Sequence, residues 1–341
     1  MNEQLPERVR GIDLYDPQRP DVRYDLSDNT NQWPLSSNVI SILSSNNNIS
    51  HYPDIYGLSL KKKLAQYYEI DVEKIVIGCG TDDVLDCAVR ALTNEGDEIA
   101  VPTPSFPMTK YFGEFNGRNI SQFTLQNDGS VNVQNISNQA KLIYLCSPNN
   151  PTGQTISKEN IKQILNSTSA FVVIDEAYGE FTDENCLDLL QNPRVLITRT
   201  FSKIYGLAGL RIGYGIGDAE VISAIEALRG PYKANTIGLQ AAIASIESAD
   251  YYANLLAEIK QTRDWFTGAL IGLDLNVVES QANFVFVSGS FSDDLKTKLL
   301  ENDFSIRQFL ANDIYGVEGI RITLAPKPVL EEFLNVLKEC I

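Results

Sequence analysis

One lysine in this chain stands where a nucleophilic amine could form a Schiff base with an aldehyde. Lys203 follows the apolar run 195–197, which is typical of a buried parallel strand, and Arg211 comes eight residues later. An ammonium at the end of a buried strand is costly, so its pKa falls and the neutral amine becomes a better nucleophile. A single lysine is more often a surface residue, so this interpretation depends on the residues at the ends of the neighbouring strands.

A carboxylate follows a second apolar run, 171–174. Asp175 comes directly after these four residues, and a buried carboxylate in such a place needs a partner. A protonated pyridine nitrogen would meet that need, and so would a magnesium ion in a nucleotide-binding enzyme. The magnesium interpretation requires a G-x-x-x-x-G-K-[ST] loop, and the chain contains no Gly-Lys pair. The pattern therefore favours the pyridine nitrogen.

Two further apolar runs end in turns that could hold a ligand. The run 75–77 leads into a glycine-containing turn, 78–83, and then into a predicted helix. Free backbone N–H groups and the helix dipole suit a phosphate there, although Thr81 could equally be an ordinary N-cap. Asp83 stands where the dinucleotide fingerprint has its third glycine, so a dinucleotide is not predicted. The run 142–145 leads into the rigid turn 146–153, which carries two asparagines.

These turns belong to one repeated pattern of short apolar run, polar turn and helix. Strands are predicted at 75–77, 98–101, 142–145, 171–174 and 195–197. Strands that alternate with helices predict right-handed crossovers and a largely parallel sheet covered on both faces. Ligands bind such sheets at the carboxyl ends of the strands, where Lys203 and Asp175 both stand.

The rest of the chain has other patterns. Residues 1–37 are polar and predict an extended arm. Residues 218–273 predict helices, broken at Gly230-Pro231, the last of which bridges to a second domain. Strands at 283–287, near 305–309 and at 319–324, with helices between and after them, predict a small α+β domain.

Composition excludes several classes of function. The formal net charge of −16 over 341 residues argues against broad nucleic-acid binding and against attraction to anionic membranes. His51 is the single histidine, which excludes a histidine-based catalytic triad or metal cluster. The five cysteines lack C-x-x-C spacing and predict free thiols and no zinc site, and the first residues lack an apolar signal segment. We therefore expect a cytoplasmic protein.

Taken together, the motifs resemble those of the fold-type I aminotransferases that depend on pyridoxal phosphate. The matching segments are Asn150-Pro151-Thr152-Gly153, Asp175 with Tyr178, and Ser202-Lys203 with Arg211, in that order and spacing. More narrowly, the chain resembles the histidinol-phosphate aminotransferase branch. That likeness rests on Asn29 and Asn31, Tyr52-Pro53-Asp54, 171–181, 200–211, 280–284 and Arg321-Ile322-Thr323.

The resemblance implies a role for each cofactor-binding residue. Lys203 would hold pyridoxal 5′-phosphate as a Schiff base and then act as the catalytic base. Asp175 would keep the pyridine nitrogen protonated, so that the ring accepts electrons from the substrate carbon. Asn150 and Tyr178 would hydrogen-bond the phenolic oxygen, and Phe106 would stack on the ring. The phosphate would be bound by Gly80, Thr81, Asp82, Thr200, Ser202 and Arg211.

The resemblance also implies substrate and subunit contacts. Arg321 would bind the terminal anion of the substrate, with Arg307 as a second anion contact, although Arg307 could instead be a surface residue. Tyr15 and Asn29 would close over the substrate from the arm. Tyr52 would reach the cofactor phosphate of a neighbouring subunit, which implies a homodimer with shared active sites.

The expected protein is thus an α/β enzyme with three parts: an N-terminal arm (1–37), a large cofactor-binding domain (38–240), and a bridging helix with a small C-terminal domain (241–341). Its expected reaction is ping-pong transamination between histidinol phosphate and 2-oxoglutarate, in histidine biosynthesis. Two alternatives remain open: an aromatic amino-acid aminotransferase, and a pyridoxal-phosphate-dependent decarboxylase of amino-acid phosphates. A non-catalytic cofactor binder is disfavoured, because Lys203 and Asp175 are both present.

Overall fold

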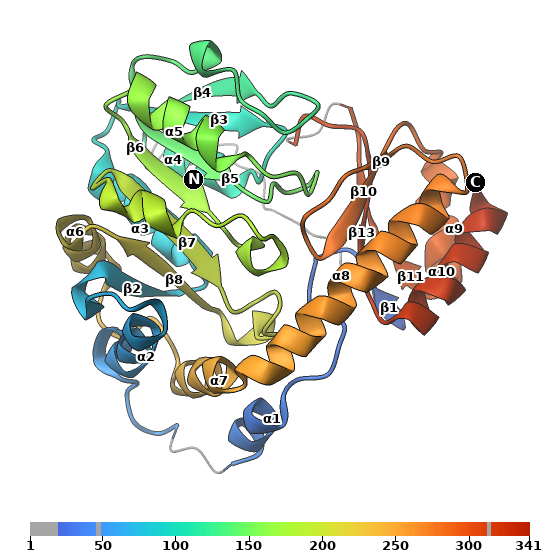
Figure 1. The fold of residues 1–341 in the computed structure, drawn as a ribbon, viewed down its shortest axis with the longest axis horizontal. Helices are drawn as coiled ribbons and strands as arrows, with labels where there is room; N and C mark the ends of the chain where they lie inside the picture. Colours follow the sequence, from blue (N-terminus) through green and yellow to red (C-terminus); the bar gives the residue numbers. More distant parts are fainter. Residues whose placement is uncertain (1–19, 46–48, 312–314) are drawn as a thin grey trace, which may run out of the picture.

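A seven-stranded sheet forms the larger part of the molecule (Figure 1). The structure is a computed structural model, and it describes residues 20–45, 49–311 and 315–341. In spatial order, the strands of this large sheet are β2 (Ile75–Cys79), β8 (Ile212–Gly217), β7 (Val195–Thr200), β6 (Phe171–Asp175), β5 (Ala140–Cys146), β3 (Glu98–Thr103) and β4 (Asn119–Thr124).

The sheet is parallel from β7 to β4, and β8 is antiparallel to both of its neighbours. The mostly parallel α/β sheet predicted from the sequence is therefore confirmed. Two of the seven strands were not predicted from the sequence, for different reasons. β4 is a polar edge strand, and β8 reads Ile-Gly-Tyr-Gly-Ile-Gly, in which the glycines hide the apolar alternation.

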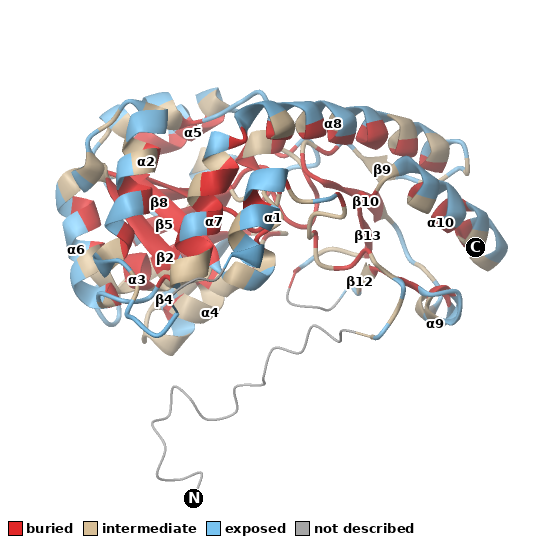
Figure 2. Ribbon diagram, turned by 90° about the horizontal axis from the view of Figure 1, so that it is seen from below, coloured by how far each residue is buried: buried red, intermediate tan, exposed pale blue. Residues whose placement is uncertain are grey.

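Helices cover both faces of the large sheet, and alternate residues of its strands point to each. One face packs against α3 (Thr81–Leu92), α4 (Met108–Phe115) and α6 (Ala219–Arg229). The opposite face packs against α5 (Lys158–Ser167) and, near β2 and β8, against α2 (Leu58–Tyr68) and α7 (Thr236–Glu247). Figure 2 shows the buried residues concentrated in the strands and on the inner sides of these helices.

A second, four-stranded antiparallel sheet lies at the C-terminal end of the molecule. In spatial order, this small sheet contains β12 (Arg307–Phe309), β13 (Gly319–Thr323), β10 (Phe284–Ser288) and β9 (Val277–Val278). Helices α9 (Asp293–Glu301) and α10 (Lys327–Cys340) pack beside it. The long helix α8 (Ala249–Ile271) runs from α7 to the small sheet and buries Leu255, Phe266 and Leu270 in that core (Figure 1).

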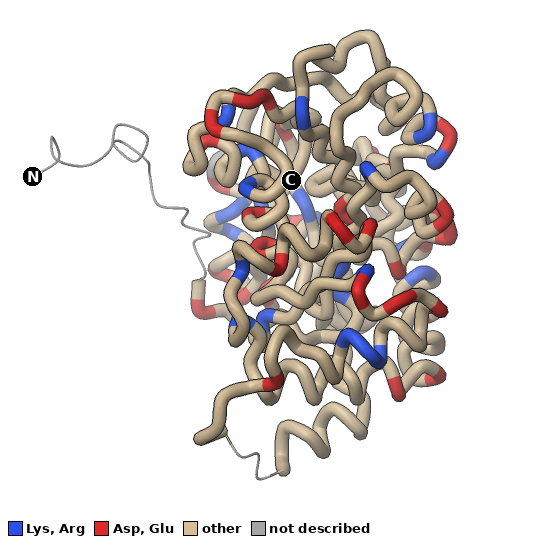
Figure 3. Tube along the Cα trace, turned by 90° about the vertical axis from the view of Figure 1, so that its left-hand side faces the viewer, with Lys and Arg blue, Asp and Glu red and all other residues tan. Residues whose placement is uncertain are grey.

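The N-terminal segment links the two sheets. Strand β1 (Tyr24–Asp25) pairs in parallel with β11 (Phe304–Ser305), and the chain then passes between the sheets to α1 (Ser37–Ser44), which packs on α7. The division into an arm and two domains stays a prediction, and its boundary at residues 240 and 241 falls inside α7. Figure 3 shows Asp and Glu residues distributed along the molecule rather than collected in one segment. None of the described helices is long and apolar enough to cross a membrane.

Gly213 of β8 lies where the strand touches the turn before α3. A methyl group at this position would overlap the backbone nitrogen of Thr81 and lie 2.6 Å from the carbonyl carbon of Gly80. Because the backbone cannot yield as a side chain does, we expect Gly213→Ala to lower the free energy of unfolding by about 1–3 kcal/mol. Denaturant unfolding of the purified protein measures this.

Gly268 in α8 provides the matched control. No atom lies within 4 Å of a methyl group added there, so Gly268→Ala should leave stability unchanged or raise it by about 0.5–1 kcal/mol. Equal unfolding midpoints for the two variants would show that β8 and the turn before α3 are not in close contact.

Candidate active site

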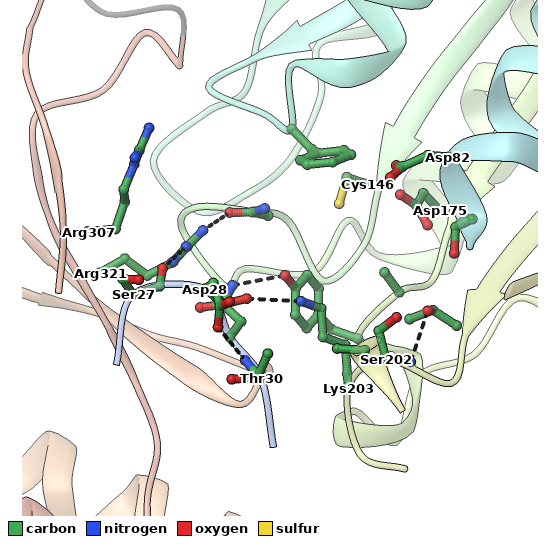
Figure 4. Close-up of a pocket in the computed structure, with 18 of the residues that line it drawn as sticks. Ser27, Asp28, Thr30, Asp82, Cys146, Asp175, Ser202, Lys203, Arg307 and Arg321 are labelled. Carbon is green, nitrogen blue, oxygen red and sulfur yellow. Dashed lines mark hydrogen bonds between the residues drawn. The ribbon is translucent and has the colours of Figure 1, made fainter. Parts of the chain in front are cut away.

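A cavity of about 600 Å³ opens between the two sheets at the carboxyl ends of β5, β6 and β7 (Figure 4). The start of α3 and the segment 27–30 form two of its walls, and Arg307 and Arg321 reach it from the small sheet. Parallel strands present their carboxyl ends at one edge of the sheet, so the residues that end or follow β5, β6 and β7 meet there. The cavity therefore collects residues that lie far apart in the chain.

Lys203 lies in this cavity just after β7, where the chain leaves the sheet. Its Nζ donates a hydrogen bond to the Asp28 carbonyl at 3.2 Å and lies 5.4 Å from the centre of the Tyr178 ring. Burial lowers the pKa of Lys203 to about 8, and the nearby positive charges of Arg321 and Arg211 add to the effect. About a tenth of the amine is therefore neutral, and so nucleophilic, at pH 7, far more than for an ordinary lysine.

Asp175 is the last residue of β6 and is almost fully buried. Its two carboxylate oxygens accept hydrogen bonds from the Tyr144 hydroxyl at 2.8 Å and the Thr198 hydroxyl at 2.9 Å. Burial raises the pKa of Asp175 to about 6, while these two hydrogen bonds act in the opposite direction. Asp175 is thus mainly ionised at neutral pH and can bind a protonated ring nitrogen.

The start of α3 and Arg211 form an anion-binding end of the cavity. Gly80 precedes the helix with a φ of 76°, and a side chain there would collide with the Arg211 guanidinium. Arg211 pairs with Asp82 at 3.2 Å, and burial raises the pKa of Asp82. The Thr200 hydroxyl accepts a hydrogen bond from the Ser202 backbone N–H at 3.0 Å. Backbone N–H groups, hydroxyls and a guanidinium at a helix N-terminus suit a phosphate.

Polar contacts also hold Asn150 and Tyr178 in the cavity. The Asn150 Oδ1 atom accepts a hydrogen bond from Arg321, whose guanidinium also donates to the Ser27 carbonyl. The Tyr178 hydroxyl accepts a hydrogen bond from Asn29 Nδ2 at 2.9 Å. Burial raises the pKa of Tyr178, which keeps its hydroxyl protonated. Both side chains can therefore donate a hydrogen bond to a ligand.

Two arginines of the small sheet stand side by side at the other end of the cavity. Arg307 of β12 and Arg321 of β13 are direct partners in the antiparallel register, so their side chains lie on the same face. Both line the cavity, and Figure 4 shows Arg321 beside Ser27, with the Arg307 side chain extending away from that contact. Like charges in directly opposed positions repel each other, so the arrangement favours an anion between them.

Most residues predicted from the sequence come together in this one cavity. Those that line it are Asn29, Thr81, Asp82, Phe106, Asn150, Asp175, Tyr178, Thr200, Ser202, Lys203, Arg211, Arg307 and Arg321. Gly80 contributes the turn before α3. Tyr52 lies outside the cavity, with 82% of its surface exposed, and stacks on Tyr232 at 4.8 Å. Tyr15 lies outside the described residues.

Sequence reasoning missed several residues that line the cavity. These are Ser27, Asp28, Thr30, Cys146, Ala177, Ala208, Gly209 and Tyr315. Most adjoin a motif already recognised, so closeness in sequence could have indicated them. Tyr315 comes after β12 in a part of the chain with no such motif, and no signal pointed to it.

The residues fit pyridoxal 5′-phosphate. The anion-binding end can hold its phosphate, Asp175 can pair with its pyridine nitrogen, and Lys203 lines the same cavity with a nucleophilic amine. Phe106 adds an aromatic side chain to the lining, and Tyr178 and Asn150 can donate to the phenolic oxygen. The donor set thus offers one contact for each polar group of the cofactor.

The lowered pKa of Lys203 predicts how the cofactor-free protein captures pyridoxal phosphate. Only the neutral amine attacks the aldehyde, so the second-order rate constant should rise about tenfold between pH 7 and pH 9 and then level off. Stopped-flow absorbance measures the rate, with Lys203→Ala as the control that lacks this capture. A rate still rising steeply at pH 9.5 would mean that the amine titrates like an ordinary lysine.

Known proteins agree with this assignment. The family model for aminotransferase class I and II matches residues 24–337. The chain is 34% identical to histidinol-phosphate aminotransferase 2 of Archaeoglobus fulgidus, covering 97% of this chain and 98% of that protein. It is 30% identical to the histidinol-phosphate aminotransferase of Syntrophotalea carbinolica, covering 99% of each.

A solved structure gives the same picture of the fold. The histidinol-phosphate aminotransferase of Sinorhizobium meliloti, in complex with pyridoxal-5′-phosphate, superposes with a TM-score of 0.89 at 23% identity, covering 99% of this chain and 97% of that one. The resemblance inferred from the motifs is thereby confirmed. Since the family model spans nearly the whole described chain, the protein belongs to the class I and II aminotransferases.

Proposed function

We propose that this enzyme uses pyridoxal 5′-phosphate to transfer the amino group of histidinol phosphate to 2-oxoglutarate. The relatives named above support this substrate by their own names, and they match nearly the whole chain. The observation that carries the proposal is the pair Arg307 and Arg321, opposed on one face of the small sheet and directed into the cavity with Lys203. A phosphate dianion offsets two guanidinium charges better than a single carboxylate does.

The residues of the chain have distinct tasks in this reaction. The bound cofactor would supply an aldehyde carbon that holds the amino group and a ring that accepts the electron pair left on the substrate Cα. Lys203 would remove the proton from Cα, since its amine is poised near neutral pH. Asp175 would hold a proton on the ring nitrogen, and Arg321 would orient the substrate by its anion. The segment 27–30 would limit access of water.

The amino donor is tested by the visible spectrum of the loaded enzyme. We expect histidinol phosphate to convert the bound cofactor to its amino form at far lower concentration than phenylalanine or tyrosine does, and 2-oxoglutarate to reverse the change. Preference for the aromatic donors would instead identify an aromatic amino-acid aminotransferase. A spectral change without recovery by 2-oxoglutarate, together with carbon dioxide release from an amino-acid phosphate, would identify a decarboxylase.

Arg307 provides a specific test of phosphate recognition. Arg307→Gln removes one of the two cations, so kcat/KM for histidinol phosphate should fall about ten- to a hundredfold. The value for phenylalanine should fall much less, because Arg321 alone can bind a carboxylate. Steady-state kinetics with both donors measure the ratio. An equal loss for both would show that Arg307 does not distinguish phosphate from carboxylate.

We further propose a homodimer in which Tyr52 binds the cofactor phosphate of the partner. Tyr52 is exposed and lies outside its own cavity, so it is available to another chain. Apolar side chains that a dimer would cover are exposed on the neighbouring elements and on α1, and these are Ile40, Leu43, Ile55, Leu58 and Tyr232. A second copy is the natural occupant, because a two-fold axis would bring both Tyr52 residues to opposite cavities.

Mixing two impaired variants at limiting cofactor concentration tests this sharing. Tyr52→Ala should weaken cofactor binding at least about tenfold, and Lys203→Ala should abolish turnover. Refolded together in equal amounts, they should regain about a quarter of the wild-type sites, because each hybrid dimer contains one intact site. Recovery of no activity beyond that of Tyr52→Ala would mean that Tyr52 serves its own chain. Sedimentation measures the dimer independently.

The proposed function also concerns the cellular compartment in which the protein works. All five cysteines are free thiols, as expected in a reducing compartment. We propose that the enzyme works in the cytoplasm, where the expected substrates of amino-acid biosynthesis are available.

A further inference from the structure

The hydroxyl of Tyr178 takes part in a hydrogen bond whose direction is fixed. A tyrosine hydroxyl has one proton to donate and can also accept. Here it accepts from the amide nitrogen of Asn29, at 2.9 Å, in a fully enclosed contact. The amide nitrogen has no lone pair to offer, so the proton of Tyr178 must point elsewhere. It remains available for a ligand in the cavity.

The orientation of the Asn29 amide is itself set by Thr323 of β13. The backbone N–H of Asn29 donates to the Thr323 hydroxyl oxygen at 3.0 Å. That hydroxyl donates its own proton to Asn29 Oδ1, at 3.3 Å. The amide oxygen is thereby directed to Thr323 and the amide nitrogen to Tyr178. One chain of donors and acceptors thus runs from the small sheet to Tyr178.

The backbone of Asn29 is held in an unusual conformation for this purpose. Its φ is 59°, in the left-handed region that asparagine tolerates better than most residues. The Asn29 carbonyl accepts a hydrogen bond from Asn283 at 3.0 Å, and the Leu26 carbonyl accepts one from the Thr323 backbone at 2.9 Å. Glycine would fit this conformation more easily, but it would leave Tyr178 without its donor.

Strand β13 orients the second donor of the site in the same way. Arg321 stands two residues before Thr323, so both side chains lie on one face of the strand. Arg321 donates to Asn150 Oδ1, which directs the Asn150 amide nitrogen away from the arginine. Strand β13 therefore determines which donor atoms of Tyr178 and Asn150 remain for the cofactor contacts that we propose.

We propose that Asn29 and Thr323 are positioning residues that direct the Tyr178 proton to the phenolic oxygen of the cofactor. This inference rests on the proposed contact between Tyr178 and the cofactor. It differs from the sequence-based prediction, in which Asn29 contacts the substrate. The Tyr178 proton is directed toward the cofactor only while the segment 26–29 is bound to β13. The arm and the small sheet are thereby linked to the cofactor.

The pH midpoint of the visible absorption change of the loaded enzyme tests the proposal. A donor at the phenolic oxygen stabilises the deprotonated form, so its loss raises the midpoint. Tyr178→Phe should raise the midpoint by about one pH unit. Asn29→Asp is isosteric but only accepts, so the Tyr178 proton turns to the new carboxylate and the midpoint should rise by a similar amount.

The double variant separates this mechanism from a simple charge effect. In the Tyr178→Phe background, Asn29→Asp should cause no further shift, because no proton remains to be redirected. Asn31→Asp is the matched control: it adds the same charge to the same segment, where the Asn31 side chain contacts the Ile204 carbonyl instead. Its midpoint should stay near that of the wild type. Thr323→Val removes the hydroxyl that orients the Asn29 amide but adds no charge. It should raise the midpoint when Tyr178 is present and leave it unchanged in the Tyr178→Phe background.

Several outcomes would overturn the inference. Equal shifts from Asn29→Asp with and without Tyr178 would mean that Asn29 acts by charge. An unchanged midpoint with a raised KM for the amino donor would support the substrate contact instead. If Tyr178→Phe itself leaves the midpoint in place, the contact of Tyr178 with the cofactor is wrong, and this inference falls with it. Should Asn29→Asp fail to fold, Thr323→Val decides between these outcomes.

Discussion

The concentration of positive charge around Lys203 is the constraint on which the rest of the site depends. An aminotransferase site must bind anions at both of its ends, which requires arginines close to the reacting lysine. Arg321 and Arg211 lie in the cavity with Lys203 and are the arginines that we propose for this task; their charges add to the effect of burial, which is the main cause of the lowered pKa of Lys203. Anion recognition and activation of the nucleophile are therefore consequences of one arrangement. A surface lysine with the same neighbours would be screened by water and would gain little.

Two adjacent buried carboxylates, Asp175 and Glu176, have different kinds of partner. Glu176 is paired with Arg199 at 2.6 Å and accepts a further hydrogen bond from the Cys186 backbone at 2.7 Å. Its charge is thus compensated within the protein, which suits a structural role. Asp175 accepts hydrogen bonds from the hydroxyls of Tyr144 and Thr198 and from the backbone of Ala177, has no cationic side chain paired with it among the described ion pairs, and faces the cavity. The cation that completes its environment is left for a ligand to supply.

The sequence was sufficient to predict the residues at the strand ends but not their fine geometry. Lys203, Asp175 and Asn150 come after apolar runs, so the parallel topology alone brings them to one edge. Asp28 reaches the cavity because the N-terminal segment contacts β11 and β13, and Tyr315 reaches it from the connection between β12 and β13; no local pattern encodes either placement. The contact between Asn29 and Thr323 joins positions 294 residues apart. The direction of each hydrogen bond in this contact depends on which atom donates and which accepts, and only the folded structure shows which atoms meet.

In the proposed function, Arg321 would serve the fold and the substrate at the same time. A guanidinium has five N–H donors in a planar fork, and Arg321 uses donors of this fork to hold Asn150 and the Ser27 carbonyl. If the substrate anion binds to Arg321 as proposed, it would lie against the group that orients Asn150, and substrate binding would then reach the phenolic oxygen of the cofactor through a single side chain. A lysine ammonium would bind the anion as a point charge but could not hold Asn150 in the same geometry. The need to orient Asn150 while binding the proposed anion, more than charge alone, would explain an arginine at this position.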